Sequence, residues 1–360
     1  MQTYKCPSCG GGITFDTITQ KLKCPYCDTE FDIQSLEAYA EAISDNKTPN
    51  HWDLESKCVY SDEEKGDLQK YICQSCGGEI VTTRTTSATT CPYCDNPIIL
   101  SEKFQGVLKP DYVIPFKLDK QQAKMKLKNH LKAKKLLPAI FKEEQHIDEI
   151  KGIYVPFWLF DSACHGSVYF QGIKQQFWSD SDYNYVKTSY YSIMREGNLE
   201  FNHVPVDGSS KMDDHLIQSL EPYDFKDAVD FHTAYLAGYF AEQYDVDQHQ
   251  CMDIANNRIR TSTEQLFYHS VKGYQSLNIQ NSHIQVQNGT IRYALYPVWL
   301  LNTTWNGNRY VFAMNGQTGK FIGDLPIDSH LVKKYFFQYF FISLSLLLVF
   351  IGILWWFRII

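Results

Sequence analysis

The chain has 360 residues, of which 44% are hydrophobic and 15% aromatic, so it is not an intrinsically disordered protein and has room for two or three folded domains. Its formal net charge of −7 argues against a nucleic acid or an anionic surface as the partner of the whole molecule. The eleven cysteines, together with opening residues that lack an apolar core, indicate a reducing compartment and metal thiolates instead of a secreted disulfide framework.

Eight of the cysteines form four Cys-x-x-Cys pairs, which are grouped in two copies of one motif. The copies contain Cys6, Cys9, Cys24 and Cys27, and then Cys73, Cys76, Cys91 and Cys94. Fourteen residues separate the pairs in each copy, and the second copy follows the first at an offset of 67 residues, which indicates an internal duplication. The copies predict small domains at residues 1–33 and 70–100, joined by a polar linker at 34–69.

Two Cys-x-x-Cys turns separated by a hairpin-length segment are typical of a zinc ribbon. Zn²⁺ takes four thiolates in a tetrahedron, and each turn brings two sulfurs to the same ion. The residues that follow the pairs are glycine or aspartate, at Gly10, Asp28, Gly77 and Asp95, types that tolerate the left-handed backbone conformation. Such a turn can direct backbone N–H groups at the sulfurs. The sequence therefore predicts two Zn²⁺ ions, each held by four cysteines.

A redox dithiol and an iron–sulfur cluster are the alternatives to zinc. A redox Cys-x-x-Cys is expected near a βαβ pattern, which this sequence lacks, and iron–sulfur spacing is usually more compact. With four cysteine ligands each predicted zinc site is closed to water, so both ions are expected to be structural. Because a unit of about 30 residues cannot bury enough apolar surface to fold alone, the metal is expected to supply its stability.

Residues 101–330 predict a mixed α+β domain. A short strand at 113–118 precedes a helix at 119–137, for which Asp119 and Gln122 form a capping box and which Pro138 ends. Further predicted elements are strands at 153–160, 167–178 and 183–195 and a helix near 245–269. A three-stranded antiparallel meander closes the domain, with turns predicted at Asn306-Gly307 and Asn315-Gly316.

A second, weaker repeat lies within this region at an offset of 141 residues. Pro156, Trp158, Leu159, Asp161, Gly166 and Tyr169 correspond to Pro297, Trp299, Leu300, Asn302, Gly307 and Tyr310. The region is therefore either two related halves or a pair of aromatic strands that resemble each other by chance. The two prolines predict edge positions or strand starts, because a proline in a central strand removes a ladder hydrogen bond.

The C-terminal segment at residues 335–357 contains 23 residues without a charge, which is enough to cross a bilayer as a helix. Tyr335 and Tyr339 at one end, with Trp355 and Trp356 at the other, are typical of membrane interfaces. Lysines on the N-terminal side outnumber the single Arg358 beyond the span, so the positive-inside rule predicts a single-pass protein of the cell membrane whose bulk is cytoplasmic. A buried core helix is the alternative.

Three other features have both a functional and an ordinary interpretation. The lysine-rich helix at 119–137 fits either an anionic lipid surface or, as we prefer, a solvated face over an apolar stripe. Cys164-His165 are neighbours whose side chains point to opposite faces of a strand, which argues against a nucleophile–base pair. The stretch from Gly316 to Lys320 does not complete a phosphate-binding loop. With no catalytic constellation in the sequence, we predict a protein that is not an enzyme.

Charge also bears on what the two cysteine motifs bind. Residues 1–33 carry three lysines against four acidic side chains, and residues 1–100 carry eight basic against fifteen acidic ones. Each Zn(Cys)₄ centre adds a formal charge of about −2. Because nucleic-acid binding depends on Lys and Arg at phosphates, these motifs are expected to present a rigid surface to a protein. A membrane-tethered nucleic-acid-binding or transcription regulator is the alternative.

The chain resembles the bacterial TFIIB-type zinc-ribbon-containing membrane proteins over nearly its whole length. The resemblance rests on the double cysteine motif and on the stretches VIPF, YVPFW, EPYDF, TAYLAGY, PVWLL and FAMNGQTGK. It implies that all eight paired cysteines hold zinc. It also implies membrane-associated partners, either phage-shock-protein-A-like or SPFH/flotillin-like, in a cell-envelope stress system. Similar chains are sometimes labelled primosomal helicases, which the missing phosphate loop does not support.

These features together predict an α+β protein with two small Cys₄ zinc ribbons, a mixed α+β domain with antiparallel meanders at 101–330, and one C-terminal transmembrane helix. Its expected function is that of a non-enzymatic adaptor on the cytoplasmic face of the membrane, which contacts lipid through residues 335–357 and docks partner proteins through the ribbons.

Overall fold

The structure is a computed structural model that describes residues 6–7, 10–16, 19, 21–33, 35–36, 52–54, 59–83, 90–101, 108–143, 147, 149–323 and 325–356. The chain divides into two compact units, each assembled from segments that are distant in sequence. Unit 1 contains Met1–Glu55, Leu159–Val206 and Gln248–Arg292, and unit 2 contains Ser56–Trp158, Asp207–Asp247 and Tyr293–Ile360. The structure is mixed α+β with one large sheet, which confirms the predicted class.

The strands form a three-stranded sheet in the order β1-β2-β3 and a twelve-stranded sheet whose central path is β11-β8-β13-β9-β12-β6-β5-β7. The small sheet contains β1 (Thr14–Asp16), β2 (Lys21–Lys23) and β3 (Glu30–Phe31). The short strands of the large sheet are β4 (Trp52–Leu54), β5 (Leu68–Ile72), β6 (Glu79–Thr83), β7 (Ile99–Ser101), β8 (Tyr112–Val113), β11 (Val229–Asp230), β12 (Phe240–Glu242), β14 (Asn308–Asn315) and β15 (Phe321–Gly323). Its long strands are β9 (Lys151–Ser179), β10 (Asn184–Asp207) and β13 (Ser276–Trp305).

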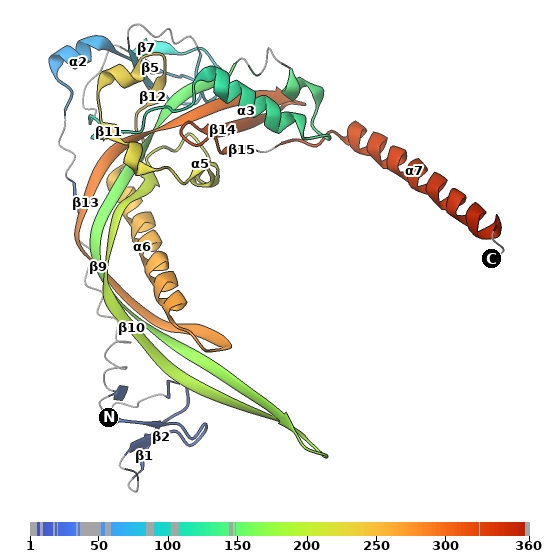
Figure 1. Cartoon of the computed structure of the whole chain (residues 1–360). Helices are drawn as coiled ribbons and strands as arrows, with labels where there is room; N and C mark the ends of the chain where they lie inside the picture. The colour runs from blue at the N-terminus through green and yellow to red at the C-terminus, as the bar shows by residue number, and fades with distance from the viewer. Residues whose placement is uncertain are drawn as a thin grey trace. The chain divides into compact units, whose positions relative to one another are not determined.

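The α-helices are α2 (Asp62–Asp67), α3 (Lys120–Lys132), α5 (Asp214–Leu220), α6 (Gln248–Ser270) and α7 (Ser329–Trp356), and short 3₁₀ helices lie at Ala139–Lys142, Phe225–Asp227 and Thr233–Leu236. The predicted helix near 245–269 is confirmed as α6. Within unit 1 it packs on β9, β10 and β13 through Ile259, beside Cys164 and Val286 (Figure 1). Part of the predicted linker belongs to unit 1, because β4 pairs with β13 in parallel.

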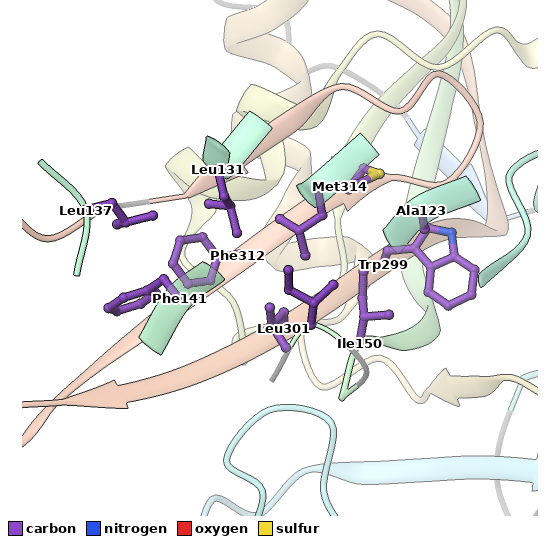
Figure 2. Packing of buried hydrophobic residues seen from close by; sticks show 11 residues of the cluster. Ala123, Leu131, Leu137, Phe141, Ile150, Trp299, Leu301, Phe312 and Met314 are labelled. Carbon is purple, nitrogen blue, oxygen red and sulfur yellow. The ribbon is translucent and has the colours of Figure 1, made fainter. Parts of the chain in front are cut away.

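Helix α3 begins as predicted and ends earlier. The side chain of Asp119 accepts the backbone N–H of Gln122, and the Gln122 side chain accepts that of Asp119, so the capping box is present. The helix ends at Lys132, before Pro138, because the next segment folds back and places Leu137 and Phe141 on the same core. Figure 2 shows this core of unit 2, in which buried residues of α3 meet side chains from β13 and β14.

The predicted closing meander is confirmed, since β13 pairs with β14 and β14 with β15, both antiparallel. Its first turn has positive φ at Asn306 (51°) and Gly307 (77°), as an Asn-Gly hairpin requires. The second turn differs from the prediction, because the residue with positive φ is Gly319 and not Asn315 or Gly316. Asn315 instead accepts the backbone N–H groups of Gln317 and Thr318 with its side-chain oxygen, which extends the turn to Lys320.

The predicted positions of the two prolines are wrong, because Pro156 and Pro297 lie inside β9 and β13. Each proline carbonyl accepts the N–H of the glycine that follows the next strand, Gly208 at 2.9 Å and Gly316 at 2.8 Å. In an antiparallel pair, the N–H and the C=O of one residue face the same neighbouring strand. The N–H that proline lacks would therefore point to a position where that neighbouring strand has already ended. The prolines therefore mark the end of each hairpin ladder and leave the rest of the strand intact.

Two segments of unit 2 make equivalent contacts around these prolines. Strand β8 pairs in parallel with β13 (Tyr112 with Ala294), and β12 pairs in parallel with β9 (Phe240 with Ile153). Each short strand leads into a long helix, β8 into α3 and β12 into α6. The segment of β8 and α3 therefore pairs with β13 through β8, and the segment of β12 and α6 pairs with β9 through β12.

The two tryptophans of the 141-residue repeat also occupy equivalent positions. The indole N–H of Trp158 donates to the backbone carbonyl of Val246 at 2.8 Å, and that of Trp299 donates to Leu118 at 3.2 Å. Both indoles are buried. Each bond joins a proline-bearing strand to the segment that precedes a helix, so the same contact is made twice.

This equivalence predicts that Trp158→Phe and Trp299→Phe will destabilise unit 2 by similar amounts. Each change leaves a half-buried carbonyl without its indole donor and removes buried apolar volume, at a cost of about 1–3 kcal/mol. Urea unfolding of the full-length protein in detergent measures both. Trp178→Phe is the matched control, because Trp178 is exposed and its replacement is expected to change stability by less than about 0.5 kcal/mol. A neutral result at one buried position and not at the other would contradict the equivalence.

Candidate metal centres

The second cysteine cluster brings four sulfur atoms together within unit 2. Cys73 and Cys76 lie in the turn between β5 and β6, and Cys91 and Cys94 lie in the turn that precedes β7. The Cys73 and Cys94 sulfurs are 3.4 Å apart and those of Cys76 and Cys91 are 3.7 Å apart. All four ligand atoms lie within 4.8 Å of one another. The structure thus assembles the four residues that the sequence predicts.

These distances fit a tetrahedral metal site. A Zn–S bond of about 2.3 Å in a regular tetrahedron places sulfur atoms about 3.8 Å apart. A disulfide requires a sulfur–sulfur distance of about 2.05 Å, and the cysteines of this cluster are free. The donor set consists of thiolates alone, which suits a soft metal ion. The second cluster can therefore hold one metal ion through four cysteines.

The first cluster brings together Cys6, Cys24 and Cys27, which also lie within 4.8 Å of one another. The Cys6 and Cys27 sulfurs are 3.6 Å apart, close to the separation expected around a metal. The fourth predicted ligand, Cys9, lies outside the residues that the structure describes. The three described sulfurs can hold a metal ion, and Cys9 as its fourth ligand stays a prediction.

At the residues that the structure describes, the four Cys-x-x-Cys turns share a positive φ and two backbone hydrogen bonds. The residue after each pair has positive φ, with values of 75° at Gly10, 56° at Asp28, 69° at Gly77 and 56° at Asp95, which confirms the prediction. In every turn the N–H of this residue donates to the carbonyl of the first cysteine, at 2.8–3.1 Å. The N–H of the first cysteine donates in turn to the carbonyl five residues ahead. These backbone hydrogen bonds therefore fix the first cysteine of each turn.

The thiols of the second cluster differ in pKa, because their hydrogen bonding differs. Burial raises the pKa of Cys76 and Cys91, and backbone N–H donors oppose the shift without overcoming it. Burial also acts to raise the pKa of Cys94, but hydrogen bonds from the backbone and side chain of Asn96 outweigh it and lower the pKa to about 7. Since a metal binds thiolates, binding releases protons and weakens as the pH falls.

The second cluster is built into the sheet of unit 2. Strand β6, which follows its first pair, is antiparallel to β12 and aligns Ile80 with Glu242 and Val81 with Ala241. Tyr93, between Cys91 and Cys94, is only 4% exposed, and its hydroxyl donates to Glu242. A hydrogen-bonded side chain thus connects the metal-binding turn to a strand 149 residues further along the chain.

Two further contacts fix the same turn. The side-chain amide of Asn302 donates to the carbonyl of Pro92 at 2.6 Å. The ammonium group of Lys151 lies 2.6 Å from the Asp95 carboxylate and also donates to the carbonyl of Cys91 at 3.2 Å. The turn is therefore held by an amide, an ammonium group and a carboxyl group that come from three separate strands of unit 2.

Glu242 is fully buried where these contacts meet. One of its oxygens accepts the Tyr93 hydroxyl, and the other accepts the Ser209 hydroxyl at 2.7 Å. Burial raises the pKa of Glu242 to about 8, although both hydrogen bonds act in the opposite direction. Sequence reasoning missed this residue. Its only signal was an acid directly after the apolar stretch at 234–241, and no motif relates it to the cysteines.

We predict that Tyr93→Phe destabilises unit 2 by about 1–3 kcal/mol, because a buried carboxyl group loses one of its two hydroxyl partners. Tyr26→Phe is the matched control: it makes the same chemical change in the equivalent turn of the first cluster, where the ring is 78% exposed, and is expected to leave stability unchanged. Chemical unfolding of the metal-loaded, full-length protein compares the two. Equal effects would contradict the structural role of Tyr93.

The Cys164-His165 pair does not form a nucleophile–base pair. The Cys164 sulfur is buried and lies 3.8 Å from the Thr263 hydroxyl, and burial raises the pKa of its thiol. The His165 ring contacts Asn198 at 2.9 Å and Glu196 at 3.2 Å. The two side chains therefore have different partners, as the prediction of opposite strand faces requires.

The C-terminal helix α7 contains one span, Ser329–Ile351, that is long and apolar enough to cross a membrane. None of this span is buried, and large apolar side chains such as Phe336 and Leu348 are exposed. The exposure argues against the alternative of a core helix buried within its own chain. By length and composition α7 is a candidate membrane span.

The chain is similar over almost its whole length to a protein of Bacillus subtilis (strain 168), the uncharacterized protein YdjG. The two are 34% identical over 334 residues, which cover 93% of each chain. No family model matches the chain, and no solved structure matches it.

Proposed function

The chain belongs to the same family as the Bacillus subtilis protein YdjG, and we propose that it is a membrane-anchored adaptor that docks partner proteins through its first cysteine cluster. In this proposal each cluster is a zinc ribbon with a structural ion, and α7 anchors the chain. The observation that carries it is the contrast between the two clusters, one fixed within unit 2 and the other with exposed large side chains.

Zinc is the metal that the donor set favours. Four thiolates in a tetrahedron form a closed structural site, and no coordination position is left for water. The ligands are Cys6, Cys9, Cys24 and Cys27 in the first ribbon and Cys73, Cys76, Cys91 and Cys94 in the second. When bound, each ion stabilises a small unit that lacks a sufficient apolar core.

The exposed apolar helix α7 supports the membrane anchor. Residues 335–357 are the proposed span, with Lys333 and Lys334 before it and Arg358 after it. The excess of lysine on the N-terminal side supports a cytoplasmic location for the bulk of the chain by the positive-inside rule. Both cysteine clusters then lie in a reducing compartment, where thiolates persist and can hold zinc.

The first cluster is the proposed docking module because it exposes side chains that suit an interface. Phe15, Tyr26 and Ile33 are all exposed, and aromatic residues are enriched at protein interfaces. The resemblance to TFIIB-type zinc-ribbon membrane proteins supports partners of the phage-shock-protein-A-like or SPFH type and a role in cell-envelope stress. The acidic balance of residues 1–100 does not favour the alternative of a nucleic-acid regulator.

Crosslinking in intact membranes of the native host, followed by identification of the crosslinked proteins, tests this function. A partner found in this way is then purified, and its binding to the full-length chain in detergent is measured. Cys24→Ser, which removes a ligand of the first cluster, is expected to abolish binding, whereas Cys164→Ser, a cysteine outside both clusters, preserves it. Unchanged binding by a Cys24→Ser variant that has lost one zinc ion would refute the docking role.

A further inference from the structure

The turns at Cys24–Cys27 and Cys91–Cys94 are equivalent in structure as well as in sequence. Asp28 and Asp95, 67 residues apart, have the same φ of 56°. A Cβ atom placed on Gly11 would lie 2.5 Å from Cδ2 of Tyr26, and one placed on Gly78 would lie 3.6 Å from Cδ2 of Tyr93. Each tyrosine ring therefore lies beside the equivalent glycine, and the same face can be compared in the two clusters.

This shared face is exposed in the first cluster and buried in the second. Tyr26 is 78% exposed, whereas Tyr93 is 4% exposed. Phe15 is 46% exposed, whereas Thr82, at the equivalent position, is fully buried. Pro25 is exposed and Pro92 buried in the same way. The second cluster thus displays, within this chain, how a surface of this type is covered by protein.

Three contacts of the second cluster define that cover. The tyrosine hydroxyl donates to a buried carboxyl group (Glu242), the proline carbonyl accepts an amide N–H (Asn302), and the aspartate pairs with an ammonium group (Lys151). The equivalent groups of the first cluster are the hydroxyl of Tyr26, the carbonyl of Pro25 and the carboxylate of Asp28. The Asp28 side chain is 83% exposed and lies 3.4 Å from Lys23, a separation that leaves it accessible to a second cation.

We propose that the first cluster docks on a different protein in the way that the second docks within unit 2. The partner surface offers a recessed Asp or Glu to the Tyr26 hydroxyl, a side-chain amide to the Pro25 carbonyl, and a lysine or arginine to Asp28. This inference rests on the proposed docking function and specifies the chemistry by which the partner is recognised.

The negative charge of the first cluster and the occupied oxygens of Glu242 argue against nucleic acid, anionic lipid and a second copy of this chain as the partner. Residues 1–33 carry three lysines against four acids, and a bound Zn(Cys)₄ centre makes the balance more negative by about two charges, which opposes nucleic acid and anionic lipid. A second copy of this chain does not offer the required acceptor at its own docking position, because both oxygens of Glu242 are already occupied by Tyr93 and Ser209.

The test begins with the full-length chain in native-host membranes, with Tyr26 replaced by the photocrosslinker p-benzoylphenylalanine. Mass spectrometry of the adduct is expected to identify a different protein and to map the crosslink beside an Asp or Glu. With that partner purified, Tyr26→Phe and Asp28→Asn are each expected to weaken binding about tenfold, the effect of one charge-assisted hydrogen bond. Glu30→Gln, which alters an exposed acid of the same cluster, is the matched control and is expected to change affinity less than twofold.

Changing the crosslinked carboxylate of the partner to its amide completes the test, because Tyr26→Phe is then expected to have no further effect. An adduct on lipid or on another copy of this chain overturns the inference. It is also overturned, with the docking function intact, if Cys24→Ser abolishes binding while Tyr26→Phe and Asp28→Asn bind within twofold of the parent. If Cys24→Ser binds normally, the docking function itself fails.

Discussion

A full-length chain carrying Cys73→Ser and Cys91→Ser is expected to lose its zinc at the second cluster and, with it, the folded structure of unit 2. Cys73 directly follows β5 and Cys91 precedes β7, so a metal held by both would join strands that occupy one end of the large sheet. Zinc contributes about 10–16 kcal/mol to the folding of isolated zinc-finger peptides, as much as the whole stability of a typical domain, about 5–15 kcal/mol. Even a fraction of this contribution is enough to unfold the unit.

The physical reason lies in the contacts of the metal-binding turn. Without the ion, the contacts between this turn and the rest of unit 2 include those of Glu242, Asn302 and Lys151, and Glu242 is a buried carboxyl group that accepts the Tyr93 hydroxyl. When the turn moves, that carboxyl group loses a partner in an apolar surrounding, which is costly. Zinc content, thermal unfolding in detergent and limited proteolysis of the full-length protein measure the effect.

Cys24→Ser provides the matched control for this prediction. It removes one ligand of the first cluster, whose strands β1 to β3 form a sheet of their own, so it is expected to reduce the bound zinc by one ion and to leave the unfolding of unit 2 unchanged. An equal loss of stability in both variants would contradict the distinction between the clusters. So would a Cys73→Ser, Cys91→Ser chain that lacks zinc at the second cluster and yet unfolds like the parent.

Local chemistry was predictable from the sequence wherever it depends on residues close together in the chain. The left-handed residues after the cysteine pairs, the capping box at Asp119 and the Asn306-Gly307 turn all follow from short-range rules, and the structure confirms each. The convergence of Cys73, Cys76, Cys91 and Cys94 was also predictable, because the spacing of two Cys-x-x-Cys turns implies a common ligand.

Features that depend on distant residues were not predictable. Tyr26 and Tyr93 occupy identical Cys-Pro-Tyr-Cys motifs, yet Tyr93 is buried and bonded to Glu242, 149 residues away, while Tyr26 is exposed. The long strand β9 was predicted as two shorter ones, at 153–160 and 167–178, whereas it runs without a break from Lys151 to Ser179. The predicted domain bounds stay a prediction, since both compact units combine segments that are distant in sequence.

The strand pairing of unit 2 shows why such distant features could not be predicted. Strand β8 pairs with β13, about 180 residues later, and β12 returns to pair with β9. Neither pairing has a local turn signal, since parallel strands are joined by long connections. The weak 141-residue repeat indicated equivalent halves, but which strand receives which segment depends on packing that a pattern of single residues does not encode. The duplication itself stays a prediction, supported by the paired contacts of Trp158 and Trp299.

Removal of the C-terminal residues after Asp328 is expected to move the protein from the membrane fraction to the soluble fraction. A finer change, Leu347→Arg with Phe350→Arg, keeps the helix length and places two cations in the exposed apolar span. Each arginine near the centre of a transmembrane helix costs about 2.5–3.5 kcal/mol on insertion scales, so the pair lowers the insertion equilibrium by several orders of magnitude. Carbonate extraction of membranes followed by immunodetection measures the retained fraction.

Leu347→Val with Phe350→Leu is the matched control, because it changes the same positions and keeps them apolar; it is expected to stay in the membrane. If the double-arginine chain is retained as well as this control, α7 is not the anchor, and its exposed apolar surface has another cover. If both arginine substitution and truncation release the chain while zinc content and the unfolding of unit 2 are unchanged, the helix acts only as a tether. Partner binding measured in detergent with the truncated chain then separates attachment from recognition, because the proposed docking through the first cluster depends on a metal-bound fold and not on the bilayer.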